Sequence, residues 1–167
     1  MENIKSNISS HNHKLLSNDP PTHDQCNCPS VKECPLNGKC LTKGVVYKAE
    51  IKSQNSGEVK TYIGMTSNTF KERYRNHVKS FKHPQYSSET ELSKHVWNLK
   101  NNRIKFAIKW SIIRRAKVYT PGADHCNLCT EEKLQIIKSK TENLLNKRNE
   151  LFSKCCHRNK FSARNFK

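Results

Sequence analysis

Apolar and polar residues alternate in three stretches of the chain, and such alternation is typical of β-strands with one buried face. The first stretch covers residues 45–51, and its apolar positions are Val45, Tyr47, Ala49 and Ile51. The second covers residues 59–65 and follows the turn Asn55-Ser56-Gly57, so the two stretches predict a hairpin. The third covers residues 104–112, with an apolar residue at every second position.

A spacing of three and four residues between apolar positions predicts helices around these strands. Thr69 can cap the first helix, with Glu72 three residues on. The buried stripe of this helix consists of Phe70, Tyr74, Val78 and Phe81. A second helix begins near Ser88, where Glu91 completes a capping box. A third runs from about Thr130 to Ser139, and a fourth follows it.

The predicted order is strand, strand, helix, helix, strand, helix, helix. This order indicates an α+β fold in which helices flank a small three-stranded antiparallel sheet, with the third strand antiparallel beside the first. A chain of 167 residues with 34% hydrophobic residues suffices for one modest core. We therefore divide it into a disordered polar leader (residues 1–25), a cysteine-rich lead-in (26–43), one core domain (44–157) and a basic tail (158–167).

The chain carries 31 Lys and Arg against 14 Asp and Glu, a formal net charge of +17. This excess favours a polyanionic partner, with nucleic acid the first candidate and an anionic membrane the second. The membrane is disfavoured because no apolar run approaches the roughly 20 residues that span a bilayer. Residues 1–25 also lack the apolar segment of a secretory signal. We therefore expect an intracellular protein without membrane contact.

Residues of the hairpin and the first helix form a candidate site for phosphodiester cleavage. Tyr47 and Tyr62 lie on paired strands, where one phenol could relay a proton from water and the other orient it. Arg73 supplies a cationic fork for phosphate oxygens. His77, four residues on and on the same helix face, can act as an acid or base or bind phosphate. Packing is the competing interpretation for Tyr47, which shares a strand face with apolar neighbours.

Such a site also needs a carboxylate that holds a divalent metal ion. Glu131 and Glu132 open the helix that follows the third strand. Carboxylate oxygens are the protein ligands that Mg²⁺ prefers. The residues alone leave both glutamates open.

Eight cysteines in a chain without a secretory signal are more often metal ligands than disulfides. Cys126 and Cys129 have the spacing of half a tetrahedral zinc site, which needs a second pair. Because the end of the third strand lies beside the start of the first, Cys34 and Cys40 ahead of the first strand converge with that pair. We therefore predict one structural zinc ion bound by these four cysteines.

Other ligand sets stay open. Cys28 could replace Cys34, whereas Cys26 is too close to Cys28 in sequence for a usual chelating pair. Cys155 and His157 form a competing second half, although Cys-x-His is an uncommon zinc spacing.

The tyrosines, the Arg/His pair and the later glutamate stand in the order of the GIY-YIG nuclease family, which this chain resembles. The resemblance implies a metal-dependent DNA endonuclease with Mg²⁺ or Mn²⁺ as the catalytic ion. It selects Glu132 as the metal ligand, because Lys133 follows it ahead of an apolar run, and it assigns Asn146 to closing the site. Val45-Val46-Tyr47 replaces the Gly-Ile-Tyr of the family and keeps its tyrosine.

A finer resemblance, over about residues 28–160, is to the endonuclease domains of Penelope-like retroelements. Its matching segments are Cys34-Pro35-Leu36-Asn37-Gly38-Lys39-Cys40, Val46-Tyr47-Lys48-Ala49, Glu91-Leu92-Ser93-Lys94-His95-Val96-Trp97, Cys126-Asn127-Leu128-Cys129 and Leu145-Asn146-Lys147-Arg148. The resemblance implies a nick whose 3′ hydroxyl primes reverse transcription, a reverse transcriptase domain or the element RNA as partners, and a nuclear location. No reverse transcriptase domain precedes the nuclease, so we interpret the chain as a fragment, a truncated element or a stand-alone derivative.

Two other functions fit the same sequence. A catalytically inactive, zinc-containing DNA-binding module would use the basic surface without cutting. An RNA-binding basic zinc protein has weaker support, because only 8% of the residues are aromatic and bases would find few stacking surfaces.

Overall fold

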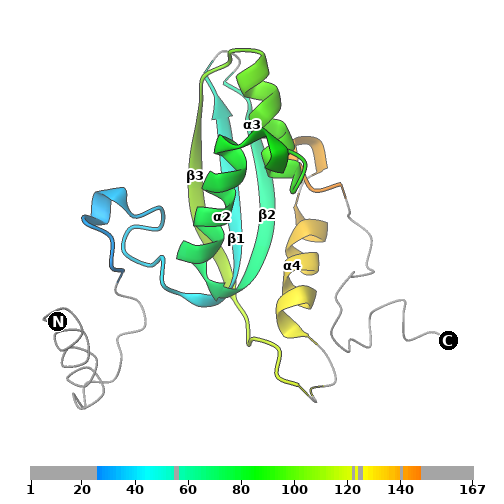
Figure 1. Cartoon of the computed structure of the whole chain (residues 1–167). Helices are drawn as coiled ribbons and strands as arrows, with labels where there is room; N and C mark the ends of the chain where they lie inside the picture. Colours follow the sequence, from blue (N-terminus) through cyan, green and yellow to red (C-terminus); the bar gives the residue numbers. More distant parts are fainter. Residues whose placement is uncertain (1–25, 55–56, 122, 124–125, 140, 148–167) are drawn as a thin grey trace, which may run out of the picture.

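The computed structural model describes residues 26–54, 57–121, 123, 126–139 and 141–147, and its centre is a three-stranded antiparallel sheet (Figure 1). The strands are β1 (Lys43–Ser53), β2 (Val59–Thr69) and β3 (Phe106–Arg115), in the order β2-β1-β3. Each strand overlaps one of the three stretches of alternating residues. The predicted α+β fold with an antiparallel sheet is therefore confirmed.

β1 is the central strand and pairs antiparallel with both neighbours. Tyr47 lies opposite Gly64 of β2, and Val45 lies opposite Arg115 of β3. Beyond that last pair, the Ala116 N–H donates to the Gly44 carbonyl at 2.8 Å. The end of β3 thus lies beside the start of β1, as the sequence predicts.

Helices pack on both faces of the sheet, and Figure 1 shows α2 and α3 together in front of it. α2 (Phe70–Lys82) and α3 (Glu91–Asn101) share one core cluster with the inward face of β1. Its buried members on these elements are Val45, Tyr47, Ala49, Ile51, Phe70, Leu92, Val96 and Leu99. α4 (Asn127–Lys138) packs against the opposite face, on Val46 and Ile63. The short 3₁₀ helices are η1 (Val31–Glu33), η2 (Pro84–Tyr86) and η3 (Thr141–Asn143).

α2 begins where the sequence predicts, because Thr69 caps it. The Oγ1 atom of Thr69 accepts a hydrogen bond from the Glu72 N–H at 3.3 Å. This cap places Arg73 one residue later, within the first turns of the helix.

α3 begins at Glu91, later than the predicted start near Ser88. Its cap is Thr90, whose Oγ1 accepts a hydrogen bond from the Ser93 N–H at 3.0 Å. The residues before Thr90 are held in η2 and the turn after it, so they do not extend the helix. Because Thr90 is the N-cap, Glu91 is the first residue of the helix and not the third, so it does not complete a capping box. Its carboxylate lies 2.7 Å from the Lys94 ammonium and 3.2 Å from that of Lys147.

α4 begins at Asn127, with Cys126 at its N-cap, which is earlier than the predicted start near Thr130. Cys129 therefore lies in the first turn of a helix and not in a loop ahead of it. This difference bears on the predicted zinc ligands below.

Residues 141–147 follow α4, contain the short 3₁₀ helix η3 and run along the outer edge of β2. No α-helix forms within them, although a fourth helix was predicted to follow the third. Thr61 and Leu144 form a parallel bridge. The Leu145 N–H donates to the carbonyl of Thr61 at 2.8 Å. This segment therefore covers part of an edge that the sheet would leave open.

The predicted leader (residues 1–25), the basic tail (158–167) and the alternative ligands Cys155 and His157 lie outside the described residues. Within the described part of the chain, no helix combines the length and the apolarity needed to cross a bilayer.

Candidate active site and metal centre

The hydroxyl of Tyr47 is the middle of a hydrogen-bonded chain that joins β1 to α2. Arg73 Nε donates to it at 3.0 Å, and His77 Nε2 lies 2.7 Å from it. Tyr47 has 0% of its surface exposed and His77 2%, so these two residues are inside the protein, whereas Arg73 is half-buried. The hydroxyl oxygen accepts the Arg73 hydrogen, and a neutral His77 with its ring hydrogen on Nδ1 offers Nε2 as the acceptor for the hydroxyl hydrogen.

His77 is a neutral imidazole in this setting. Burial, and to a smaller extent the positive charge of Arg73, lower the pKa of His77 to about 3. Its ring stacks on Phe81 with centroids 6.0 Å apart and packs against Trp110 at 5.3 Å. A buried, neutral ring has no surface to offer a phosphate. Its geometry fits a hydrogen-bond acceptor that positions the Tyr47 hydroxyl.

Gly64 leaves the space that this chain occupies. A Cβ atom at Gly64 would stand 2.6 Å from the Tyr47 hydroxyl and 3.0 Å from a ring carbon of Tyr62. Even the smallest side chain would therefore push the two phenols out of place. Gly64, two residues after Tyr62, thus permits a close approach that no other residue permits.

Two further residues lie in the electrostatic influence of Arg73: Tyr62 of β2 and Glu132 of α4. Tyr62 is 9% exposed, and burial raises its pKa, so its phenol stays protonated at neutral pH. Burial also raises the pKa of the half-buried Glu132 to about 7, although the charge of Arg73 acts in the opposite direction. The Arg73 charge acts on both residues, so one cation and one carboxylate share this corner of the fold.

Glu131, the alternative carboxylate, is engaged elsewhere. It accepts a hydrogen bond from Gln135 Nε2 at 2.7 Å and lies 3.5 Å from Arg114 Nε of β3. Of the two glutamates at the start of α4, Glu132 is the one whose pKa the Arg73 charge lowers, and its carboxylate also accepts a hydrogen bond from the backbone of Met65.

Asn146 was predicted to close the site, but its side chain is used on the backbone of β2. Its Oδ1 accepts from the Ile63 N–H and its Nδ2 donates to the Ile63 carbonyl, both at 2.8 Å. Ile63 lies between Tyr62 and Gly64. The Asn146 amide is therefore engaged by the backbone of β2, and its effect on the site is to hold that strand, with Tyr62 and Gly64, in position.

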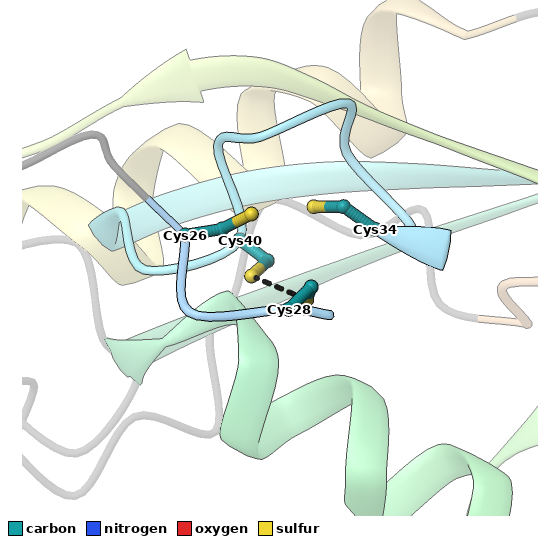
Figure 2. Close-up of side chains that lie close together, drawn as sticks. All are labelled: Cys26, Cys28, Cys34 and Cys40. Carbon is teal, nitrogen blue, oxygen red and sulfur yellow. Dashed lines mark hydrogen bonds between the residues drawn. The ribbon is translucent and has the colours of Figure 1, made fainter. Parts of the chain in front are cut away.

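Four cysteines of the lead-in gather near the start of β1 and α2 (Figure 2): Cys26, Cys28, Cys34 and Cys40. Their sulfur atoms all lie within 4.8 Å of one another, and those of Cys28 and Cys40 are 3.7 Å apart. Four thiolates around a tetrahedral zinc ion, at about 2.3 Å each, stand about 3.8 Å apart. The cluster therefore has the size and the donor chemistry to hold a metal ion.

The backbone around Cys34 is shaped for an anionic sulfur. Asn37 and Gly38 have φ angles of 47° and 92°, which turn successive N–H groups toward one side. Burial raises the pKa of Cys34, but hydrogen bonds from the backbone of this turn outweigh burial and lower it. Burial and the neighbouring thiols raise the pKa of Cys40. A bound cation is what would ionise all four thiols together.

The structure does not assemble the predicted quartet. Cys126 and Cys129 lie 3.3 Å from each other in the core cluster beneath α4. Cys34 and Cys40 belong to the cluster on the opposite face of the sheet. Strand order brings both pairs toward one end of the sheet, but it does not specify the face on which each pair packs.

Cys26 is the ligand that the sequence argument excludes. The spacing of Cys26 and Cys28 is too short for one chelating turn, yet the two thiols reach the cluster from an irregular segment without needing such a turn. The available signal was the density of cysteines in the lead-in, where residues 26–40 hold the whole cluster.

Comparisons with protein families, with curated proteins and with solved structures find no match for this chain. Its function is therefore inferred from the geometry of its own residues.

Replacing Cys26 should lower the metal content of the purified protein by about one equivalent per chain, because three thiolates hold a metal ion more weakly than four. Elemental analysis of Cys26→Ala measures this loss. Cys126→Ala is the matched control, since it removes a buried cysteine on the other face, and it should keep the metal. Metal kept in Cys26→Ala but lost in Cys126→Ala would move the site to the α4 face.

Proposed function

We propose that the chain is a metal-dependent endonuclease that hydrolyses phosphodiester bonds of DNA. The observation that carries the proposal is the half-buried Arg73 held on the buried Tyr47–His77 pair, with the half-buried carboxyl group of Glu132 within the electrostatic influence of Arg73. Removing such charges from water costs folding free energy. Perturbed groups of this kind concentrate at functional sites.

Arg73 is suited to neutralise the phosphate. Its Nε–H is held by Tyr47, which fixes the plane of the guanidinium, and the fork carries further donors for oxygens that gain charge in the transition state. Tyr62, with a protonated hydroxyl, can orient the attacking water. Tyr47 and His77 are positioning residues, because burial keeps them from the substrate.

Glu132 supplies the metal-binding carboxylate of this proposal. Mg²⁺ usually takes one or two protein carboxylates and completes its shell with water and substrate phosphate, so a single half-buried glutamate beside the phosphate-binding Arg73 fits it. When bound, Mg²⁺ or Mn²⁺ would neutralise phosphate charge and lower the pKa of water. Glu132 must be ionised to hold the ion.

We assign structural zinc to the four-cysteine cluster. A complete set of four thiolates leaves no open coordination position, which is typical of structural and not of catalytic zinc. The order of the motifs supports membership of the GIY-YIG family, with a pattern closest to the nuclease domains of Penelope-like retroelements. In that setting the nick would prime reverse transcription in the nucleus, with a reverse transcriptase domain or the element RNA as partners.

The exposed side of α2 offers a surface for the DNA backbone. Arg75, Lys79 and Lys82 recur at intervals of four and three residues, are exposed, and lie on the helix that carries Arg73. Glu72 is the acidic residue of this helix and lies in its first turn. Cations spaced along one helix face match a track of phosphates and read no base sequence.

Arg73→Gln should reduce nicking of supercoiled plasmid on the order of a hundredfold or more, because it removes a preorganised charge contact. Nicked and linear forms are scored with Mg²⁺ or Mn²⁺, and EDTA is the control for metal dependence. Arg103→Gln removes the same charge from the exposed turn after α3 and should nick like the wild type. Equal losses in both variants would reduce Arg73 to a surface charge. Wild-type protein that binds DNA but never nicks it would favour the inactive DNA-binding module.

Cleavage should rise with pH and level off above about 7, since the pKa of Glu132 is about 7 and the ionised carboxylate binds the metal. The raised pKa also means that the protonated carboxyl group stabilises the fold relative to the ionised one. This stabilisation is present in acid and is lost as the pH rises toward 7. Glu132→Gln should therefore abolish cleavage and melt at a higher temperature than the wild type above neutral pH, with the difference vanishing in acid. Thermal unfolding across pH measures this, and Glu131→Gln should cleave normally. The reverse result would assign the metal to Glu131.

Affinity for duplex DNA should fall steeply with salt, and Arg75→Gln with Lys79→Gln should lower the log–log slope by about two. The matched control is Lys52→Gln with Lys109→Gln, which removes two exposed charges from the strands of the sheet. Titration of a labelled duplex at several salt concentrations gives the slopes. An equal change in the control pair would show that DNA does not follow α2.

A further inference from the structure

The backbone of the cysteine-rich lead-in caps the catalytic helix. The Phe70 N–H donates to the Thr42 carbonyl at 3.0 Å, and the Lys71 N–H donates to the Cys40 carbonyl at 2.7 Å. The first N–H groups of a helix have no partner inside the helix and need one outside. Thr69 satisfies one of them with its side chain. Two others are satisfied by a loop that contains a metal ligand.

The side chain of Lys71 makes a second link to the cluster. Its ammonium donates to Asn27 Oδ1 at 2.5 Å, to the Asn27 carbonyl at 3.3 Å and to the Cys28 sulfur at 3.6 Å. Asn27 stands between the ligands Cys26 and Cys28. Four thiolates around one divalent ion carry net negative charge, so a metal-loaded cluster attracts this ammonium. Such contacts to ligand atoms tune metal affinity.

Apart from these hydrogen bonds, the lead-in has little apolar packing of its own to hold it in this position. η1 buries none of its residues. The buried residues between positions 26 and 42 are Cys34, Leu36, Cys40 and Thr42, and half of these are members of the cluster. A segment this short lacks the apolar area to order itself and depends on a cross-link.

We propose that zinc in the four-cysteine cluster holds in place the lead-in carbonyls that cap α2. Lys71 is then the positioning residue through which metal occupancy sets the place of Arg73. As far as activity is concerned, this rests on the proposed nuclease function. Arg73 follows Lys71 by two residues and must stay 3.0 Å from the Tyr47 hydroxyl. A displacement on the order of 1 Å costs on the order of a hundredfold in rate. Metal loss would thus slow cleavage without unfolding the sheet.

Amide hydrogen exchange of the full chain, zinc-loaded and after chelation, tests the cap directly. Chelation should speed exchange at Phe70 and Lys71 at least about tenfold, because their acceptors move away, while β1 amides at Tyr47 and Ala49 stay protected. Unchanged exchange at Phe70 and Lys71 would overturn the proposal. Lost protection across all strands would overturn it as well, since zinc would then support the whole fold.

Lys71→Met keeps the aliphatic stem and removes the ammonium. It should weaken zinc binding about tenfold in competition with a chromophoric chelator, and it should slow nicking by the zinc-loaded protein. Lys94→Met, from an exposed ion pair on α3, is the matched control and should change neither. Equal zinc affinity in Lys71→Met and wild type would remove Lys71 from this role.

Hydrogen exchange and zinc affinity test the role of the cluster, whereas nicking tests the nuclease function, so the two can fail separately. If the wild type never nicks, the proposed function falls and with it the control of activity, whereas exchange and zinc affinity still decide whether the cluster caps α2. If the wild type nicks at the same rate with and without zinc, the nuclease function stands and the control by zinc is overturned.

Discussion

The buried hydroxyl of Tyr47 is the constraint on which the arrangement of β1, β2 and α2 depends. A phenol without solvent contact has to find its hydrogen-bond partners inside the protein. Arg73 and His77 provide them from successive turns of α2, so the helix can lie on the sheet in one rotation only. Gly64 completes the constraint, because its strand approaches the hydroxyl more closely than any side chain would allow. Packing and site geometry are therefore one requirement here.

The sheet divides the molecule into two faces with different tasks. On one face, the cysteine-rich lead-in bonds the first turn of α2, and the Tyr47 hydroxyl bonds Arg73 and His77 farther along the same helix. The position of the N-terminal half of α2 therefore depends on both. On the other face, α4 packs through an apolar cluster that includes Cys126 and Cys129. These two cysteines help to seat the helix that carries Glu132. The site thus joins side chains whose supports lie on opposite faces of the sheet.

How far the sequence predicts this structure depends on what each feature requires. Alternating apolar positions specify a strand locally, and the Thr69 cap specifies the start of α2, so both were predictable. The four-cysteine cluster was not predictable, because which cysteines meet depends on the sheet face that a loop crosses, and strand order does not specify that face. The amide of Asn146 is a similar case: a late asparagine can be placed near the site by its motif, but its partner on Ile63 depends on the path of residues 141–147.

The position of β2 at the edge of the sheet gives Asn146 its importance. An edge strand leaves one row of N–H and C=O groups unpaired, and such strands move more easily and recruit other strands. Tyr62 and Gly64 both lie on this edge, so any shift of β2 would change the space around the Tyr47 hydroxyl. The Asn146 amide pairs with both groups of Ile63, as a neighbouring strand would, but it ends the pairing there. Leu145 adds one more bond at Thr61. Residues 144–146 thereby hold the edge strand in register at Thr61 and Ile63 and occupy that part of its edge, and both effects preserve the close approach that Gly64 permits.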